Sequence, residues 1–397
     1  MKQVTKDFLT ILKDARFNSK TNIIIEDFDT LYKLSNEHQV SALVYNQIYQ
    51  QDNLSSVLRK QWSLETIKIN ASQMIKTQRF LHVYKRFLDA NVKVVVVKGL
   101  ICRSLYPVPD NRPSNDEDLY IQRCDLKTVS SIFIEEGFQK ISEEEDEVKF
   151  LDYKSGLSIE LHLALFSKKS NAYGRYQSIF KDTFNFLTIH QIENIRVYSL
   201  SHNQHLLFLI LHFTKHFLHG GVGIRQLMDI IMYIETFSDK LNWKTIFNNL
   251  ETLGLVTFVL NIFEICHQYL SFDYKYVNLG NYQRIENEYE DLLEDIMESG
   301  IFGQTSNERI HSSTITLNAM EKGKVNVLRS VFPSLESMKG KYEYLNDKPY
   351  LLPVAQASRI LNYLKHSDSK ESKKTVDLGN QRVNLLKKYK IMDDSVR

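Results

Sequence analysis

The sequence predicts an α+β protein, in which a small mixed β-sheet is preceded and followed along the chain by helical parts. The 397 residues include only 14 Gly and 6 Pro, and chains with so few turn-forming residues tend to form long helices. Within this helical background, residues 92–97 form a nearly continuous valine run that ends at Lys98-Gly99. Strand-like and helix-like segments alternate from there to about residue 166.

Composition excludes several classes of protein. Hydrophobic residues make up 43% of the chain and charged residues 25%, which is typical of globular proteins and not of disordered or rod-like ones. The formal net charge is only +2, so bulk charge does not indicate a nucleic-acid partner. Cys102, Cys124 and Cys266 are too far apart for a zinc motif or a disulfide framework. With no apolar leader and no membrane-spanning stretch, we expect a cytoplasmic protein.

Helical periodicity dominates both ends of the chain. Apolar residues recur every three or four positions through 1–71, which predicts an N-terminal helical part. The same periodicity predicts a C-terminal helical domain over 167–365, and no segment beyond residue 170 reads convincingly as a strand. The helices of this C-terminal domain are expected at 200–218, 225–236, 243–253 and 256–270. The Ser- and Lys-rich residues 366–375 predict a linker, and 383–392 predict a basic helix in the tail 366–397.

The central part, residues 72–166, carries the predicted sheet. A helix over 72–90 leads into the valine run, which is apolar enough to be a strand buried on both faces. A short helix after Gly99 and a proline-bearing loop then lead to a strand at 116–122, followed by a helix at 124–137. Three more strands are expected at 138–141, 148–153 and 157–165, with the acidic run 143–147 at a hairpin tip.

Three carboxylates are predicted to share one face of this sheet. Asp116 and Asp118 are two residues apart in a strand, so both project from the same face, roughly 6–7 Å apart. In the alternating segment 157–165, Glu160 and His162 lie on the face opposite the aliphatic residues. Carboxylates held this close repel one another unless a divalent cation lies between them, which makes Mg²⁺ the expected cofactor.

The strand-to-helix turn at Lys98-Gly99 is a candidate phosphate site. Backbone N–H groups at the start of a helix attract phosphate, and Gly99 has no side chain to obstruct the approach. Such turns are common, so this feature gains weight only together with the carboxylates that follow it.

The order of these motifs resembles a little-characterised nucleotidyltransferase family of the DNA polymerase β-like nucleotidyltransferase superfamily. The resemblance would extend from about Leu31 to Leu364. Its central motifs are Lys98-Gly99, Tyr106-Pro107, Arg112–Leu119 and Ile159–His162, and its later ones are His212–Phe217, Arg225–Asp229, Val331–Pro333 and Leu351–Arg359.

The resemblance implies Mg²⁺-dependent nucleotidyl transfer. Asp116 and Asp118 would bind two Mg²⁺ ions, with Glu160 as the third carboxylate, and the attacking and leaving oxygens would both be stabilised at the α-phosphorus. Lys98 and Arg112 would neutralise phosphate charge.

Two residues depart from the pattern of the superfamily. Its usual Gly-Ser is Gly99-Leu100 here, so phosphate binding would depend on backbone groups, on Lys98 or on a nearby serine such as Ser114. Glu117 replaces an apolar residue between the two aspartates, and a charge there indicates that the strand begins at the rim of the sheet.

Two helical motifs have alternative interpretations. His212, His216 and His219 share one helix face, and the first two have a spacing that binds zinc in some proteins, but no further ligand is nearby in the sequence. His216 contacting nucleotide or acceptor, or simple packing, explains the motif better. Arg225 and Asp229 are spaced for an intrahelical ion pair, and a phosphate-contacting Arg225 is the alternative.

The resemblance therefore implies a nucleotidyltransferase with an NTP donor. The acceptor is open among a small molecule, a sugar, a protein side chain and a nucleic-acid end. The second hypothesis is an inactive protein that binds nucleotide without turnover, because the Gly-Ser serine is missing. A transferase acting on nucleic acid is a third, disfavoured by the nearly neutral charge.

Overall fold

A seven-stranded mixed sheet organises the computed structural model. The structure describes residues 1–286, 288–300, 342, 344–358 and 369–392, together with Arg309, Thr316, Leu317, Leu335 and Met338. The strands are β1 (Val95–Val97), β2 (Asp116–Tyr120), β3 (Gln139–Glu143), β4 (Glu147–Asp152), β5 (Leu157–His162), β6 (Thr188–Ile192) and β7 (Ile195–Ser199). Their order across the sheet is β3-β4-β5-β2-β1-β7-β6, with helices before and after it along the chain. The α+β class is confirmed.

The valine run forms a strand enclosed by neighbours, as its composition predicts. β1 pairs antiparallel with β2 and parallel with β7, while β2 pairs parallel with β5. All three residues of β1 have no exposed surface. β2, the strand that carries the two aspartates, is therefore the central strand of the sheet.

The hairpin of β6 and β7 corrects the prediction that no strand follows residue 170. The two strands pair antiparallel, and β7 extends the sheet beside β1. Their apolar residues alternate with polar ones over only five positions each, and Ile189 is 44% exposed at the edge of the sheet. This signal is too short and too mixed to read as a strand without its neighbours. The sheet thus continues to Ser199, beyond the expected end at residue 166.

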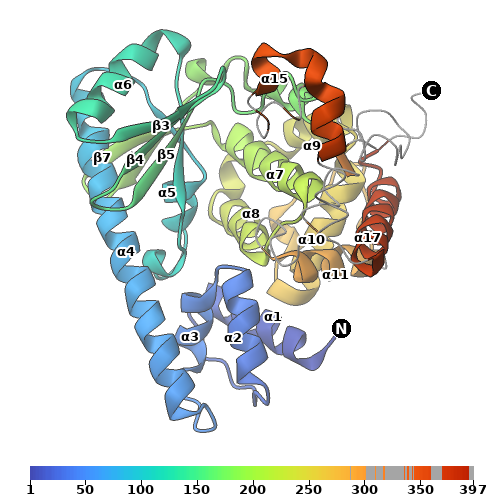
Figure 1. Cartoon of the computed structure of the whole chain (residues 1–397). Coiled ribbons are helices and arrows are strands. Elements are labelled where there is room, and N and C mark those ends of the chain that lie inside the picture. Colours follow the sequence, from blue (N-terminus) through green and yellow to red (C-terminus); the bar gives the residue numbers. More distant parts are fainter. Residues whose placement is uncertain are drawn as a thin grey trace.

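Four helices precede the sheet: α1 (Gln3–Arg16), α2 (Phe28–Glu37), α3 (Ser41–Ile48) and α4 (Ser56–Asp89). α4 begins at the cap Ser55, whose hydroxyl accepts the N–H of Leu58, and its 34 residues extend about 51 Å. Figure 1 shows α4 running from the N-terminal helices up along the sheet. The expected boundary at residue 71 falls inside this helix.

The two faces of the sheet differ in character. Phe133 of α6 (Leu126–Glu135) stacks on Phe150 at 4.8 Å, and Phe150 lies opposite Ile159, so α6 covers the apolar face. The other face carries the aspartates and Glu160. α7 (His202–His219) lies near this polar face. Its residue His212 is close enough to Asp118 for the charge of that carboxylate to affect the pKa of the His212 ring.

The four helices expected after the sheet are present: α7, α8 (Ile224–Thr236), α9 (Trp243–Thr252) and α10 (Val256–Leu270). They are followed by α11 (Glu290–Ser299), α15 (Tyr344–Asp347) and α17 (Ser369–Lys388). In Figure 1, α7 and α8 lie between the sheet and the helices α10, α11 and α17.

The tail differs from its prediction. Residues 369–375 begin α17 instead of forming a linker, and 366–368 lie outside the described residues. The ring of Tyr389 is buried against Phe258, so the end of the tail packs on the core. The motif residues 331–333 and Arg359 also lie outside the described residues. Among the helices that the structure describes, none has the length and apolar character needed to span a bilayer.

Candidate functional site

The strand register places the predicted carboxylates on adjacent strands. Asp116 lies opposite Ser158, and Asp118 lies directly opposite Glu160 on the parallel strand β5. Residues paired in this way share a face of the sheet. Asp118 and Glu160 are thus neighbours on the polar face. Asp116 lies on the same face two residues earlier, at the beginning of β2.

A compact set of donor atoms surrounds Asp118. Asp118, Glu160 and His162 each offer one ligand atom within 4.8 Å of the others. The Nε2 atom of His162 lies 3.0 Å from Oδ1 of Asp118 and 3.9 Å from Oε2 of Glu160, and its Nδ1 lies 3.3 Å from Oε2 of Glu147. Two carboxylates and an imidazole are donors that divalent cations accept, so these residues fit a metal ion.

Two lysines neutralise the carboxylates. The ammonium of Lys98 lies 2.8 Å from Oδ2 of Asp118, and that of Lys149 lies 2.6 Å from Oε1 of Glu160. Although burial opposes ionisation, Lys98 and His162 hold the pKa of Asp118 well below its usual range. Burial lowers the pKa of Lys98, but Asp118 and Asp116 outweigh it and raise the value to about 12. Burial and the charge of Asp118 raise the pKa of Glu160.

Lys98 has an unusual backbone conformation. Its φ is 62° and its ψ is −109°, a combination that residues with a side chain rarely adopt. Its N–H donates to Nε2 of His205 at 3.2 Å, and Nδ1 of His205 lies 2.8 Å from the hydroxyl of Ser199. α7 and β7 therefore hold the end of β1 in this conformation.

The helix start at Gly99 does not offer the expected phosphate site. The N–H of Leu100 donates to Oε2 of Glu117 at 2.8 Å, and Oε1 of Glu117 accepts from Arg103 at 2.8 Å. A Cβ atom at Gly99 would lie 2.0 Å from the Glu117 carboxylate. A carboxylate of the protein thus fills the position expected for phosphate. Glu117 is only 2% exposed on the central strand, so the prediction that its charge marks the rim of the sheet is wrong.

Arg112 makes a structural contact where phosphate binding was expected. Its Nε and Nη2 atoms donate to the two oxygens of Asp229 at 3.1 and 2.6 Å, and Tyr106 donates to the same carboxylate at 2.9 Å. Arg112 is 1% exposed. This pair joins the loop before β2 to α8, and it replaces the predicted intrahelical pair of Arg225 with Asp229.

Arg225 is also held by protein groups. Its Nη1 atom donates to Oε1 of Gln39 at 2.9 Å and to the carbonyl of Pro113 at 2.6 Å. Burial and the neighbouring Arg112 lower its pKa to about 10. The arrangement ties α8 to the N-terminal helices and to the approach to β2.

Ser114 supports the start of β2. Its N–H donates to Oε1 of Gln73 at 2.7 Å, and its hydroxyl donates to the carbonyl of Asp116 at 2.7 Å. Its contacts in the structure thus position Asp116, and phosphate binding by Ser114 stays a prediction.

His216 lies beside His212 on α7, with 3.1 Å between their Nε2 atoms. Burial and the charge of Lys98 hold the pKa of both rings well below the usual value, so both are neutral. In the part of the chain that the structure describes, no third ligand completes a metal site around them. Contact between His216 and a nucleotide or acceptor stays a prediction.

Several site residues were not predicted from the sequence. His162 was placed on the correct face by alternation but was not assigned a role. Glu147 was expected at the hairpin tip and Lys149 in the strand that follows it, and neither was assigned a role; both belong to β4. Lys215 of α7 is half-buried; burial lowers its pKa, while Asp118, Glu147 and Glu160 act in the opposite direction. The sequence feature that these residues share, and that could have identified them, is a polar side chain on the inward face of a strand or helix.

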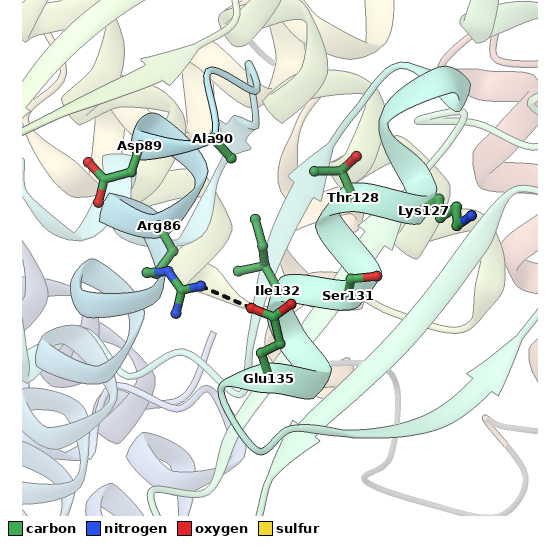
Figure 2. A pocket seen from close by; sticks show the side chains of 8 residues that line it. All are labelled: Arg86, Asp89, Ala90, Lys127, Thr128, Ser131, Ile132 and Glu135. Carbon is green, nitrogen blue, oxygen red and sulfur yellow. Dashed lines mark hydrogen bonds and ion pairs between the residues drawn. The ribbon is translucent and has the colours of Figure 1, made fainter.

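Two surface hollows lie away from these residues. One, of about 510 Å³, lies between α4 and α6 on the apolar side of the sheet. Arg86 and Glu135, which both line it, form an ion pair of 2.9 Å, drawn as a dashed line in Figure 2. The other, of about 620 Å³, is lined by residues between Tyr45 and Ser63. Neither hollow includes a predicted site residue, so the charged cluster, and not a cavity, defines the candidate site.

The α+β fold and its acidic sheet face define a nucleotidyltransferase-like protein. The chain belongs to the family described as uncharacterised nucleotidyltransferase, which matches residues 26–271. The resemblance found in the sequence is thereby confirmed, although the match ends before the last two motifs, Val331–Pro333 and Leu351–Arg359. No curated protein matches the chain. An antigenic nucleotidyltransferase-like protein from Paracoccidioides brasiliensis is similar in structure at 13% identity, with a TM-score of 0.31, covering 50% of this chain and 93% of that one.

Proposed function

We propose that this protein is a metal-dependent nucleotidyltransferase that moves a nucleoside monophosphate from an NTP to an acceptor. The observation that carries the proposal is the cluster of Asp118, Glu160 and His162, with Asp116 on the same strand, in a chain of this family. The acceptor is a small molecule, a sugar or a protein side chain, and a nucleic acid is not expected at a net charge of +2.

Each residue of the cluster has a separate role in this proposal. Asp118 and Glu160 would hold a Mg²⁺ ion with His162, and Asp116 would add a ligand for a second ion. Bound metal supplies charge stabilisation at the triphosphate and at the attacking oxygen. Glu147 fixes the orientation of the His162 ring through Nδ1. Lys98 and Lys215 bring positive charge to the polar face, where the phosphates would bind.

Thermal unfolding tests this proposal directly, because a ligand that binds the native state raises its Tm. The parent protein, Asp116→Asn and Asp118→Asn are melted with each of the four common NTPs, with and without Mg²⁺. We expect a Mg²⁺-dependent rise in Tm with at least one NTP in the parent and none in Asp118→Asn. Glu135→Gln, which changes an exposed carboxylate on α6, serves as the control and should behave as the parent. An equal rise in Asp118→Asn would contradict the proposal.

A second candidate function is nucleotide binding without turnover. It is favoured by the start of the helix at Gly99, where Leu100 replaces the superfamily serine and Glu117 occupies the backbone N–H. Pyrophosphate release separates the two functions. Binding of an NTP without pyrophosphate release, across sugar, small-molecule and protein acceptors, would favour the second.

A further inference from the structure

We propose that Lys98 is an internal counter-ion, which occupies the cation position on Asp118 in the metal-free protein and which a divalent metal must displace. The inference rests on the metal site of the proposed function and concerns how that site is filled. It starts from the environment of Asp118, which is 3% exposed.

Both oxygens of the Asp118 carboxylate already have partners. Oδ1 faces Nε2 of His162 at 3.0 Å, and Oδ2 faces the ammonium of Lys98 at 2.8 Å. A buried carboxylate with so little exposure requires such compensation, because an isolated buried charge is strongly unfavourable. A metal ion that binds Oδ2 would therefore meet the ammonium of Lys98 at the same oxygen.

The backbone shows that this contact is not an accident of strand geometry. Val97 lies directly opposite Asp118, so in a regular strand the next residue, Lys98, would project from the other face, beside Glu117. The positive φ of Lys98 interrupts the alternation. Its ammonium consequently reaches Asp118, while Glu117 on the other face is paired with Arg103 and with the N–H of Leu100.

His205 is the positioning residue that maintains this conformation. Its ring is fully buried, and Nε2 accepts the N–H of Lys98, so the proton of the neutral ring lies on Nδ1 and is donated to Ser199. Strained backbone persists where surrounding contacts hold it in place, and it concentrates at functional sites. Here the contact directs a lysine onto a metal-binding carboxylate.

Displacement of Lys98 links two binding events. The metal replaces one positive charge at Asp118 with two, and the released ammonium is then free to compensate phosphate oxygens on the same face. Metal binding and triphosphate binding would thus favour each other, although the metal alone would bind weakly.

The test measures binding of Mn²⁺, a paramagnetic substitute for Mg²⁺, to the metal-free full-length protein by electron paramagnetic resonance, without nucleotide. Lys98→Met keeps an unbranched side chain as far as Cε but removes the ammonium, and it is expected to bind Mn²⁺ about tenfold more tightly than the parent. Lys98→Arg keeps the charge and should bind as weakly as the parent. Lys93→Met, which removes an exposed positive charge shortly before β1, is the matched control and should not change the affinity.

Lys98→Gly guards against a folding defect, because glycine adopts the positive φ without strain and also lacks the ammonium. It should bind Mn²⁺ as tightly as Lys98→Met. Unchanged or weaker Mn²⁺ affinity in both variants, or no binding in the parent and both variants, would overturn the inference. The proposed function fails on a different observation, the absence of any NTP-dependent rise in Tm.

Discussion

Glu117 and Asp118 are consecutive residues with opposite surroundings. Asp118 faces the ammonium of Lys98 and the imidazole of His162 on the polar side of the sheet, while Glu117 is buried on the other side against the start of α5 (Gly99–Arg103). A carboxylate at the N-terminus of a helix satisfies a free N–H group and interacts well with the helix dipole. Gly99 is required here because any side chain would occupy the space of Glu117.

Gly99→Ala should therefore destabilise the protein by about 1–3 kcal/mol, through overpacking against Glu117. Urea unfolding of Gly99→Ala, Glu117→Ala and the double variant measures the coupling. We expect most of the cost of Gly99→Ala to disappear in the Glu117→Ala background. An equal cost in both backgrounds would show that Glu117 is not the obstacle.

The strain at Lys98 predicts a difference between two variants that both lose the ammonium. Lys98→Gly should be more stable than Lys98→Ala by about 1–2 kcal/mol, because only alanine retains the Cβ atom that makes a positive φ unfavourable. Urea denaturation at pH 7 measures both free energies of unfolding. If alanine is as stable as glycine, the backbone at this position is not strained.

At the scale of elements, the pair of Arg112 and Asp229 fixes the loop before β2 against α8. Both side chains are almost fully buried, and the two hydrogen bonds are bidentate. Removing one partner of such a pair leaves an uncompensated buried charge. The position of Asp116 depends on this loop, because Ser114 and Pro113 lie between it and Arg112.

Arg112→Met should destabilise the protein by about 3–5 kcal/mol, and Arg112→Met/Asp229→Leu should recover most of that loss. Chemical denaturation measures both. Arg112→Lys, which keeps the charge but not the bidentate contact, should still show the NTP-dependent rise in Tm. Loss of that rise without loss of stability would restore the phosphate-binding role expected from the sequence.

The sequence predicts elements well where the signal is local. The valine strand, the long helices, the face shared by Asp116 and Asp118, and the face shared by Glu160 and His162 all follow from periodicity within one segment. The β6–β7 hairpin was missed because its strands are short and belong to the sheet only through β1. Arg112 and Glu117 were misread for a related reason: their partners, Asp229 and Arg103, are set by tertiary contacts that spacing in the sequence does not reveal.

At the scale of the whole molecule, buried histidines connect the parts of the chain. Nδ1 of His38 accepts the N–H of Ile224 at 3.2 Å, and its Nε2 lies 3.3 Å from the carbonyl of Met297, so the N-terminal helices meet both α8 and the end of α11. Burial lowers the pKa of His38 from 6.5 to about 4. Burial also places the pKa of His205, which is fully enclosed, well below 6.5.

These histidines make the protein sensitive to mild acid. Below pH 6.5 the unfolded chain takes up protons that the folded chain does not, so the free energy of unfolding decreases as the pH falls. This decrease continues down to the pKa of the histidine in the folded protein, which is about 4 for His38. At one pH unit below 6.5, His38 and His205 should each lower it by about 1.4 kcal/mol. Urea unfolding between pH 7.5 and 5.5 measures this slope, and His38→Gln should reduce it. A free energy of unfolding that does not change over this pH range would contradict the conclusion that His38 and His205 are buried as neutral rings.

The place of β1 in the sheet also affects how the chain is made. Val95 pairs with Tyr198 of β7, a strand that the ribosome produces much later than β1 itself. At roughly 5–20 residues per second, the nascent chain waits on the order of 5–20 s between the two strands. During that interval an apolar strand has one edge without its partner, and such edges invite pairing with other chains. The yield of soluble protein in a cell therefore depends on what shields this valine strand until the β6–β7 hairpin has emerged.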